Sequence, residues 1–309
     1  MPPSSGRGAE ALAEIRQGIE GRDFASFEEL QAFVRDLNDQ RNQRPVSDFQ
    51  GLSPDQMHRL LYFPFDSASL VEFPPCLGTT PSAPILSLFQ MLAEAIGERG
   101  LKPTAAGNLP RKLVQEAALA YASDDLQREL MRFRSIRTEA DFPDLHVTRV
   151  VAGLASLIRK HRGRFILGRD CRRIMAEQGL AGICPLLLRA YAERFNWGYQ
   201  DGYPDLYFIQ DSFLLTLYLL DRYGEEWRSN TFYEDAFLRA FPGIVEDVGS
   251  VFYDSPVNTV RRCYSWRCLK RFGAFLGLVE IRQEPGRMLD PVFELRKLPL
   301  LNEAVIFNT

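Results

Sequence analysis

The residues with the clearest chemical potential are seven cations that lie close together between positions 159 and 173. They are Arg159, Lys160, Arg162, Arg164, Arg169, Arg172 and Arg173, against a single acid, Asp170. A guanidinium group offers parallel donors in a planar fork that matches the oxygens of a phosphate. The stretch therefore predicts a phosphate-contacting site, to which Arg149 on the preceding segment adds another cation. The alternative is a solvated basic face that balances acids such as Asp141 and Asp144 elsewhere in the chain.

A second basic run combines cations with aromatic residues near the C-terminal end. It contains Arg261, Arg262, Arg267, Lys270 and Arg271, interleaved with Tyr264, Trp266 and Phe272. Arginine beside aromatic rings can stack on unpaired bases. However, Tyr264, Leu269 and Phe272 recur at helical spacing, and this favours a core-facing stripe.

The segment 195–204 has the most unusual composition, with four aromatic residues among amides and a carboxylate. Ligand sites are often built from aromatic walls with a few polar groups. If this segment forms a pocket, its candidate residues are Trp197, Tyr199, Asp201 and Tyr203. The alternative is a glycine-bent helix connection that covers its own core.

Motifs of catalysis and metal binding are missing from the sequence. The three histidines show no HExxH spacing, and no Walker, GxGxxG or GxSxG string occurs. The five cysteines are scattered, which is typical of reduced thiols rather than of a zinc site. We therefore predict no catalytic residue, no metal, no cofactor and no enzymatic activity.

The cations need elements that position them, and the surrounding pattern indicates a winged helix. Apolar residues at helical spacing, from Val147 to Ile158, precede a turn signal at Arg162–Arg164 and an apolar strand at Phe165–Leu167. The same cadence of helix, short strand and helix appears over 85–121 and again over 260–306. We predict a mainly α (α+β) fold with a helical N-terminal arm and tandem winged-helix-like units with small β-hairpins around a helical middle.

This interpretation divides the chain into four segments. Residues 1–8 are expected to be disordered, and 9–84 to form a helical arm followed by a proline-rich linker on the surface. Residues 85–180 are expected to hold two winged-helix-like units, and 181–309 a helical segment with a third hairpin-bearing unit. Ser26 and Ser53 are predicted N-caps of two helices in the arm.

Composition limits the classes of function. The net charge of the 309-residue chain is only −3, which argues mildly against a dedicated non-specific nucleic-acid binder. No apolar run reaches the ~18 residues of a membrane helix, and the first residues lack the apolar core of a secretion signal. We expect a cytoplasmic protein with no membrane partner.

Several strings resemble those of a group of uncharacterised bacterial proteins with tandem winged-helix-like units. They are Gly51-Leu52-Ser53-Pro54 with the helix that follows, Gly107-Asn108-Leu109-Pro110-Arg111, Arg194-Phe195-Asn196-Trp197, and Arg296-Lys297 before Pro299-Leu300. The resemblance spans most of the chain and implies one shared architecture. It implies no activity, cofactor or site residue.

The sequence thus leads to two hypotheses of function. The first is a cytoplasmic bacterial accessory protein that contacts nucleic acid through the basic stretch 159–173. The second is a protein-interaction or scaffold module, with a protein partner or self-association through a small-residue face at Ala152, Ala155 and Ser156.

Overall fold

The computed structural model describes residues 5–79, 81–121, 136–249, 255–283 and 292–308. Helices dominate these residues, and the strands form small antiparallel pairs. The predicted class, mainly α with small β-hairpins, is confirmed. No helix among the described residues has the length and apolar content to cross a bilayer.

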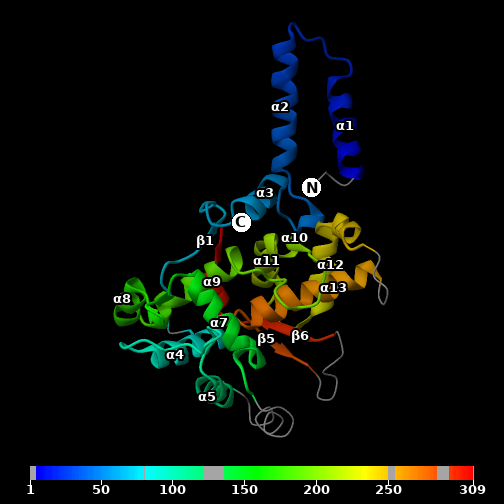
Figure 1. Ribbon diagram of the computed structural model, residues 1–309. Coiled ribbons are helices and arrows are strands. Elements are labelled where there is room, and N and C mark those ends of the chain that lie inside the picture. Colours follow the sequence, from blue (N-terminus) through cyan, green and yellow to red (C-terminus); the bar gives the residue numbers. More distant parts are fainter. Residues whose placement is uncertain (1–4, 80, 122–135, 250–254, 284–291, 309) are drawn as a thin grey trace.

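Two helices form an arm that projects from the rest of the molecule (Figure 1). Helix α1 (Ser5–Ile19) runs antiparallel to α2 (Phe27–Gln43), with Glu14 and Arg41 paired at 3.6 Å. The Ser26 hydroxyl accepts a hydrogen bond from the Glu29 amide, which confirms the predicted N-cap. The predicted disorder of 1–8 is wrong from Ser5 onward, because a helix nucleated by the apolar residues after it extends backwards at low cost. Residues 1–4 lie outside the described residues.

The arm joins the body through η1 (Ser47–Phe49) and α3 (Pro54–Tyr62). Ser53 and Gln56 form a complete capping box at the start of α3, so this predicted cap is confirmed. The proline-rich linker that follows is not a surface segment, since Leu70, Leu77 and Ala83 are buried. Strand β1 (Val71–Glu72) also pairs with β7 (Ile306–Phe307). The apolar residues between the prolines anchor the segment to the core.

The body contains a first compact unit, 84–167, which we call unit A. Its elements are α4 (Pro84–Ile96), α5 (Arg111–Tyr121), η2 (Glu139–Asp141), α7 (Pro143–Leu154), β2 (Ile158–His161) and β3 (Arg164–Leu167). Helix α4 packs against α5, α7 and β3. Leu101, between α4 and α5, pairs with Phe165 of β3. The two units predicted within 85–180 therefore share one small sheet.

Unit A is followed by the helical middle of the chain. Helices α8 (Arg169–Glu177) and α9 (Leu180–Glu193) pack against each other, and α9 also contacts α7. Within the segment expected to be helical, α10 (Tyr207–Asp211) and α11 (Phe213–Tyr223) follow each other and meet at Ser212. Residues 213–220 of α11 are all buried, which explains the most apolar run of the sequence.

A second compact unit, 213–297, follows the same order of elements, and we call it unit B. After α11 come β4 (Arg228–Ser229), α12 (Asn230–Ala240), η3 (Pro242–Asp247), α13 (Pro256–Tyr264), η4 (Ser265–Ala274), β5 (Val279–Arg282) and β6 (Glu294–Lys297). The sheet order is β4–β6–β5, so the last strand lies in the middle. In unit A, Leu101 likewise pairs with β3, the last strand. Helix α14 (Pro299–Ala304) lies between β6 and β7.

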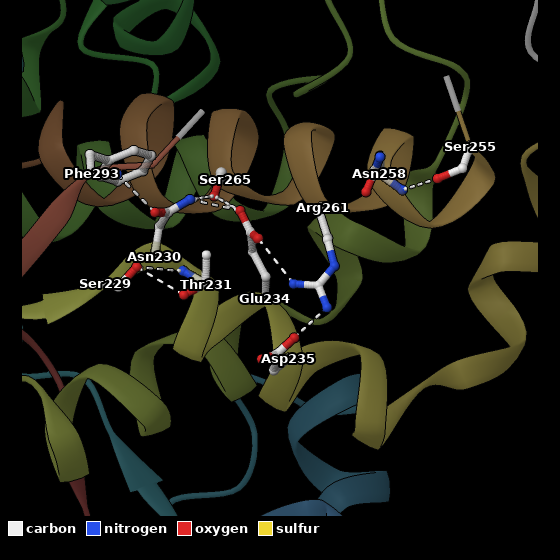
Figure 2. Close-up of polar contacts among 10 residues, drawn as sticks. All are labelled: Ser229, Asn230, Thr231, Glu234, Asp235, Ser255, Asn258, Arg261, Ser265 and Phe293. Carbon is white, nitrogen blue, oxygen red and sulfur yellow. Dashed lines mark hydrogen bonds and ion pairs between the residues drawn. The ribbon is translucent and has the colours of Figure 1, made fainter. Parts of the chain in front are cut away.

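A buried polar network holds unit B together (Figure 2). The Asn230 side-chain amide donates to Glu234 Oε1 at 2.8 Å and to Ser265 Oγ at 3.2 Å, and its carbonyl accepts from the Phe293 amide at 2.9 Å. Arg261 reaches the same carboxylate and also Asp235. The network ties α12 to α13, to the start of η4 and to the residue before β6.

Candidate nucleic-acid interface

The β2–β3 hairpin presents two different faces because residues alternate along each strand. Ile158 and Lys160 share a face with Phe165 and Leu167, and this face covers the core of unit A. Arg159, His161 and Arg164 belong to the opposite face by the same register. At the tip, Arg162 and Gly163 have φ of 47° and 74°, as the central residues of a type I′ turn require.

Six of the predicted cations are exposed and have no carboxylate partner among the described residues. They are Arg159, Lys160, Arg162, Arg164, Arg169 and Arg172. Two of them are oriented by backbone carbonyls, because Arg164 donates to Gly100 O at 3.0 Å and Arg172 to Leu167 O at 2.8 Å. The ammonium of Lys160 lies 5.3 Å from the centre of the Phe165 ring, on the other side of the hairpin from Arg159. The hairpin therefore carries positive charge on its open face and at its tip.

Two other predicted cations are neutralised by neighbouring acids. Arg149 pairs with the buried Glu139 at 2.6 Å and is itself largely buried. Arg173 lies 3.2 Å from Glu177 and 3.9 Å from Asp170 on its own helix. Arg149 is part of the internal packing of unit A, so its assignment to the phosphate site is wrong, and Arg173 contributes little free charge.

Helix α7, which precedes the hairpin, has no surface for reading base edges. Thr148 is fully buried and donates to Asp144 O at 2.8 Å. Of the small-residue face predicted for self-association, Ala152 is fully buried, Ala155 is half-buried and Ser156 is exposed. Because α7 packs against both α4 and α9, many of its side chains contact other parts of the protein instead of solvent.

Sequence reasoning missed a buried junction centred on Glu139. This carboxylate accepts hydrogen bonds from the Leu109 amide at 2.6 Å, His146 Nδ1 at 2.8 Å and Arg149 Nε at 2.6 Å. The other ring nitrogen of His146 lies 3.4 Å from the Tyr199 hydroxyl. Burial alone would raise the pKa of the Glu139 carboxyl, but the three donors outweigh it and lower the pKa below its usual 4.5.

The lowered pKa makes Glu139 a source of pH-dependent stability. The contribution is present above the unfolded pKa and is lost as the pH falls through the folded pKa. We expect Glu139→Gln to lower the free energy of unfolding at pH 7 by about 3 kcal/mol, because the variant weakens a buried charge pair. Urea unfolding at pH 7 and at about pH 3.5 measures this, and the difference between wild type and variant must shrink at the lower pH. An equal difference at both pH values would contradict this origin.

The aromatic segment 195–204 covers the core, and none of its four candidate residues is among those that line the cleft described below. The Trp197 ring is buried, and its Nε1 donates to Tyr191 O at 2.8 Å. Asp201 forms a buried ion pair with Arg267 at 2.7 Å and also accepts from the Tyr203 amide. Of the four candidates only Tyr199 is exposed, at 37%. This outcome favours the alternative that the sequence left open.

Arg267 and Arg271 of the second basic run make internal contacts, whereas Lys270 lines the cleft described below. Arg267 is buried with Asp201, and Arg271 donates to the carbonyls of Trp197 and Tyr199. Tyr264, Leu269 and Phe272 are fully buried, as the core-stripe interpretation predicts.

A cleft of about 430 Å³ lies between α7 of unit A and η4 of unit B. Its polar and aromatic lining includes Tyr121, Asp144, Gln200, Trp266, Lys270 and Arg271. Trp266, Lys270 and Arg271 belong to the second basic run of the sequence, but the other lining residues come from segments far apart in the chain, so the cleft itself was not predicted. The described residues contain no group of three or more His, Cys, Asp or Glu side chains that could hold a metal ion.

Comparison with known proteins identifies one related segment. Residues 81–180 match the family model described as the Y4jL N-terminal domain. The match covers all of the described part of unit A together with α8. No curated protein and no solved structure matches the chain significantly.

Proposed function

We propose that unit A is a winged-helix-like module that contacts the phosphate backbone of nucleic acid through its β2–β3 hairpin. The order helix, strand, helix, helix, hairpin, with the last strand in the middle of the sheet, supports the winged-helix assignment. In such modules the hairpin, or wing, can lie along the backbone of a duplex.

The observation that carries this proposal is the free charge of Arg159, Arg162 and Arg164. These side chains lie on the open face and the tip of the hairpin, and none pairs with a carboxylate in the described part of the chain. Phosphate oxygens are the ligands that such planar donors fit.

Unit B provides an internal comparison, since its hairpin also carries arginines. There, Arg282 pairs with Glu294 at 3.0 Å and Arg296 pairs with Glu280 at 2.8 Å. The arginines of the β5–β6 hairpin are neutralised across the strands, whereas those of β2–β3 are left for an external anion. We assign the contact to unit A for this reason.

The proposed contact is with the backbone rather than with base edges. Sequence-specific readout requires side chains that reach into a groove, and α7 has its polar residues turned inward or paired. We therefore expect binding that depends little on sequence.

Binding to a fluorescently labelled duplex of mixed sequence, followed by anisotropy over a series of salt concentrations, tests the proposal. A hairpin that neutralises roughly four to six phosphates gives a slope of log K against log salt of about −3.6 to −5.4. Two unrelated sequences should give closely similar affinities. Absence of binding at ~50 mM salt would rule the proposal out.

The alternative function, a protein-interaction module, is favoured by the arm. Helix α2 has no buried residue, and Leu12 and Phe27 are exposed by 59% and 67%. These apolar side chains are not covered by the described part of the chain and are available to a protein partner. Failure of salt-dependent duplex binding would favour this alternative.

A further inference from the structure

The cleft between units A and B is a second candidate site, distinct from the hairpin. Its volume of about 430 Å³ falls within the range of small-molecule sites, roughly 300–1,000 Å³. Pro143, Asp144 and Val147 come from α7, and Trp266 and Lys270 come from η4. Both units must therefore be in place for the cleft to exist.

The π-helical geometry of η4 brings several of the residues that line the cleft onto one face of the helix. In an α-helix, Phe275 would point about 180° away from Trp266, because each residue turns the chain by ~100°. A π-helix has more residues per turn, and here the Phe275 amide bonds to the carbonyl of Lys270, five residues earlier. Trp266, Lys270, Arg271, Ala274 and Phe275 consequently all line the same cleft. Helical segments of this kind occur frequently at functional sites.

The cleft contains a cation without an anionic partner. Within the described residues, the Lys270 amine has no ion pair or hydrogen bond, and its ammonium lies 4.6 Å from the centre of the Phe293 ring. Burial lowers the pKa of this amine, so a bound anion would stabilise its charged form. Arg271 adds a second cation, which is fixed by its hydrogen bonds to Trp197 O and Tyr199 O.

The remaining polar groups suit the edge of a planar heterocycle. The Asp144 side chain accepts from the Tyr121 hydroxyl, and burial raises the pKa of its carboxyl above the ordinary value. Gln200 offers both a donor and an acceptor at the rim. Trp266 is 40% exposed and supplies a ring face on which a base can stack.

We propose that this cleft binds a nucleoside monophosphate, with the base against Trp266, its polar edge toward Asp144 and Gln200, and the phosphate at Lys270. The ligand matches the cleft in size, in its flat ring with hydrogen-bond donors, and in a negative group that complements the unpaired amine. The site is independent of the hairpin, because none of the cations at 159–173 lines the cleft.

Titration of the full chain with AMP, GMP, CMP and UMP, followed by tryptophan fluorescence and calorimetry, tests this proposal. We expect saturable binding of at least one nucleotide, with weaker binding of its nucleoside and of inorganic phosphate. Lys270→Met should weaken nucleotide binding about ten- to hundredfold while leaving nucleoside binding nearly unchanged, since it removes a charge-assisted contact to the phosphate. Trp266→Ala should weaken both.

Lys112→Met is the matched control, because Lys112 is exposed on α5 beside Glu116 and does not line the cleft. It should bind nucleotide as the wild type does. Unfolding curves of all variants establish that each is folded. If Lys270→Met is unstable, Trp266→Ala still tests the proposal, because Trp266 is exposed and its removal should not unfold the protein. Absence of saturable binding by all four nucleotides, or binding unchanged in both cleft variants, would overturn the proposal. Loss of duplex binding in hairpin variants that still bind the nucleotide would separate the two sites.

Discussion

The triple substitution of Arg159, Arg162 and Arg164 by alanine is expected to abolish most of the affinity for duplex DNA. Removing three phosphate contacts should reduce the slope of log K against log salt by about 2.7 and lower the affinity roughly 100-fold at ~50 mM salt. The three side chains are exposed on the hairpin, so the variant should keep the wild-type unfolding curve. Anisotropy titrations of the same duplex at several salt concentrations measure both quantities.

A matched control must change the net charge equally without touching the hairpin. The triple substitution of Arg59, Arg173 and Arg189 by alanine does so, because each of these exposed arginines pairs with an acid on its own helix. We expect this control to bind within a few-fold of wild type. Equal losses in the two triple variants would show that net charge, rather than the hairpin, governs binding.

The largest effect on stability is expected at the ion pair between Asp201 and Arg267. Both side chains are almost completely buried, and Arg267 also donates to the carbonyls of Pro204 and Leu206. Asp201→Ala should lower the free energy of unfolding by about 3–5 kcal/mol, because it leaves a buried guanidinium without its counter-charge. Chemical denaturation followed by circular dichroism measures the difference.

Two comparisons separate the buried charge from other causes. Glu294→Ala breaks the exposed pair with Arg282 and should cost no more than about 1 kcal/mol. The double variant Asp201→Leu/Arg267→Met removes both buried charges and should recover a substantial part of the loss. A double variant as unstable as Asp201→Ala would show that packing of the loop, and not the unpaired charge, is responsible.

Elements defined by local signals were predictable from the sequence. The second helix expected within 85–121 is present as α5 (Arg111–Tyr121), and the capping signals at Ser26 and Ser53 are both confirmed. The hairpin strand around Phe165 was also predicted, because an apolar run beside an Arg-Gly turn is a short-range pattern. Ile158, in contrast, was assigned to a helix and lies in β2, since helical spacing continues past the turn at Ser156, where φ is 60°.

The site was less predictable because its contacts join distant positions. Arg149 is neutralised by Glu139, and Arg267 is neutralised by Asp201, which lies 66 residues away in the chain. Neither pairing leaves a mark in the spacing of residues along the chain. The widened turn of η4 is equally invisible, because its apolar and charged residues fit an α-helix as well. The exposure of the hairpin cations could be expected from the sequence. The burial of Arg149 against Glu139, which removes it from the predicted phosphate site, could not.

The pairing of β1 with β7 has a consequence for the order of folding. It joins Val71 to Phe307, and Asn308 also bonds to Glu72 over a separation of 236 residues. On the ribosome, the segment around Leu70 cannot pair with β7 until residues 306–308 have emerged. Until then, unit A and unit B can fold separately, while β1 and β7 remain unpaired.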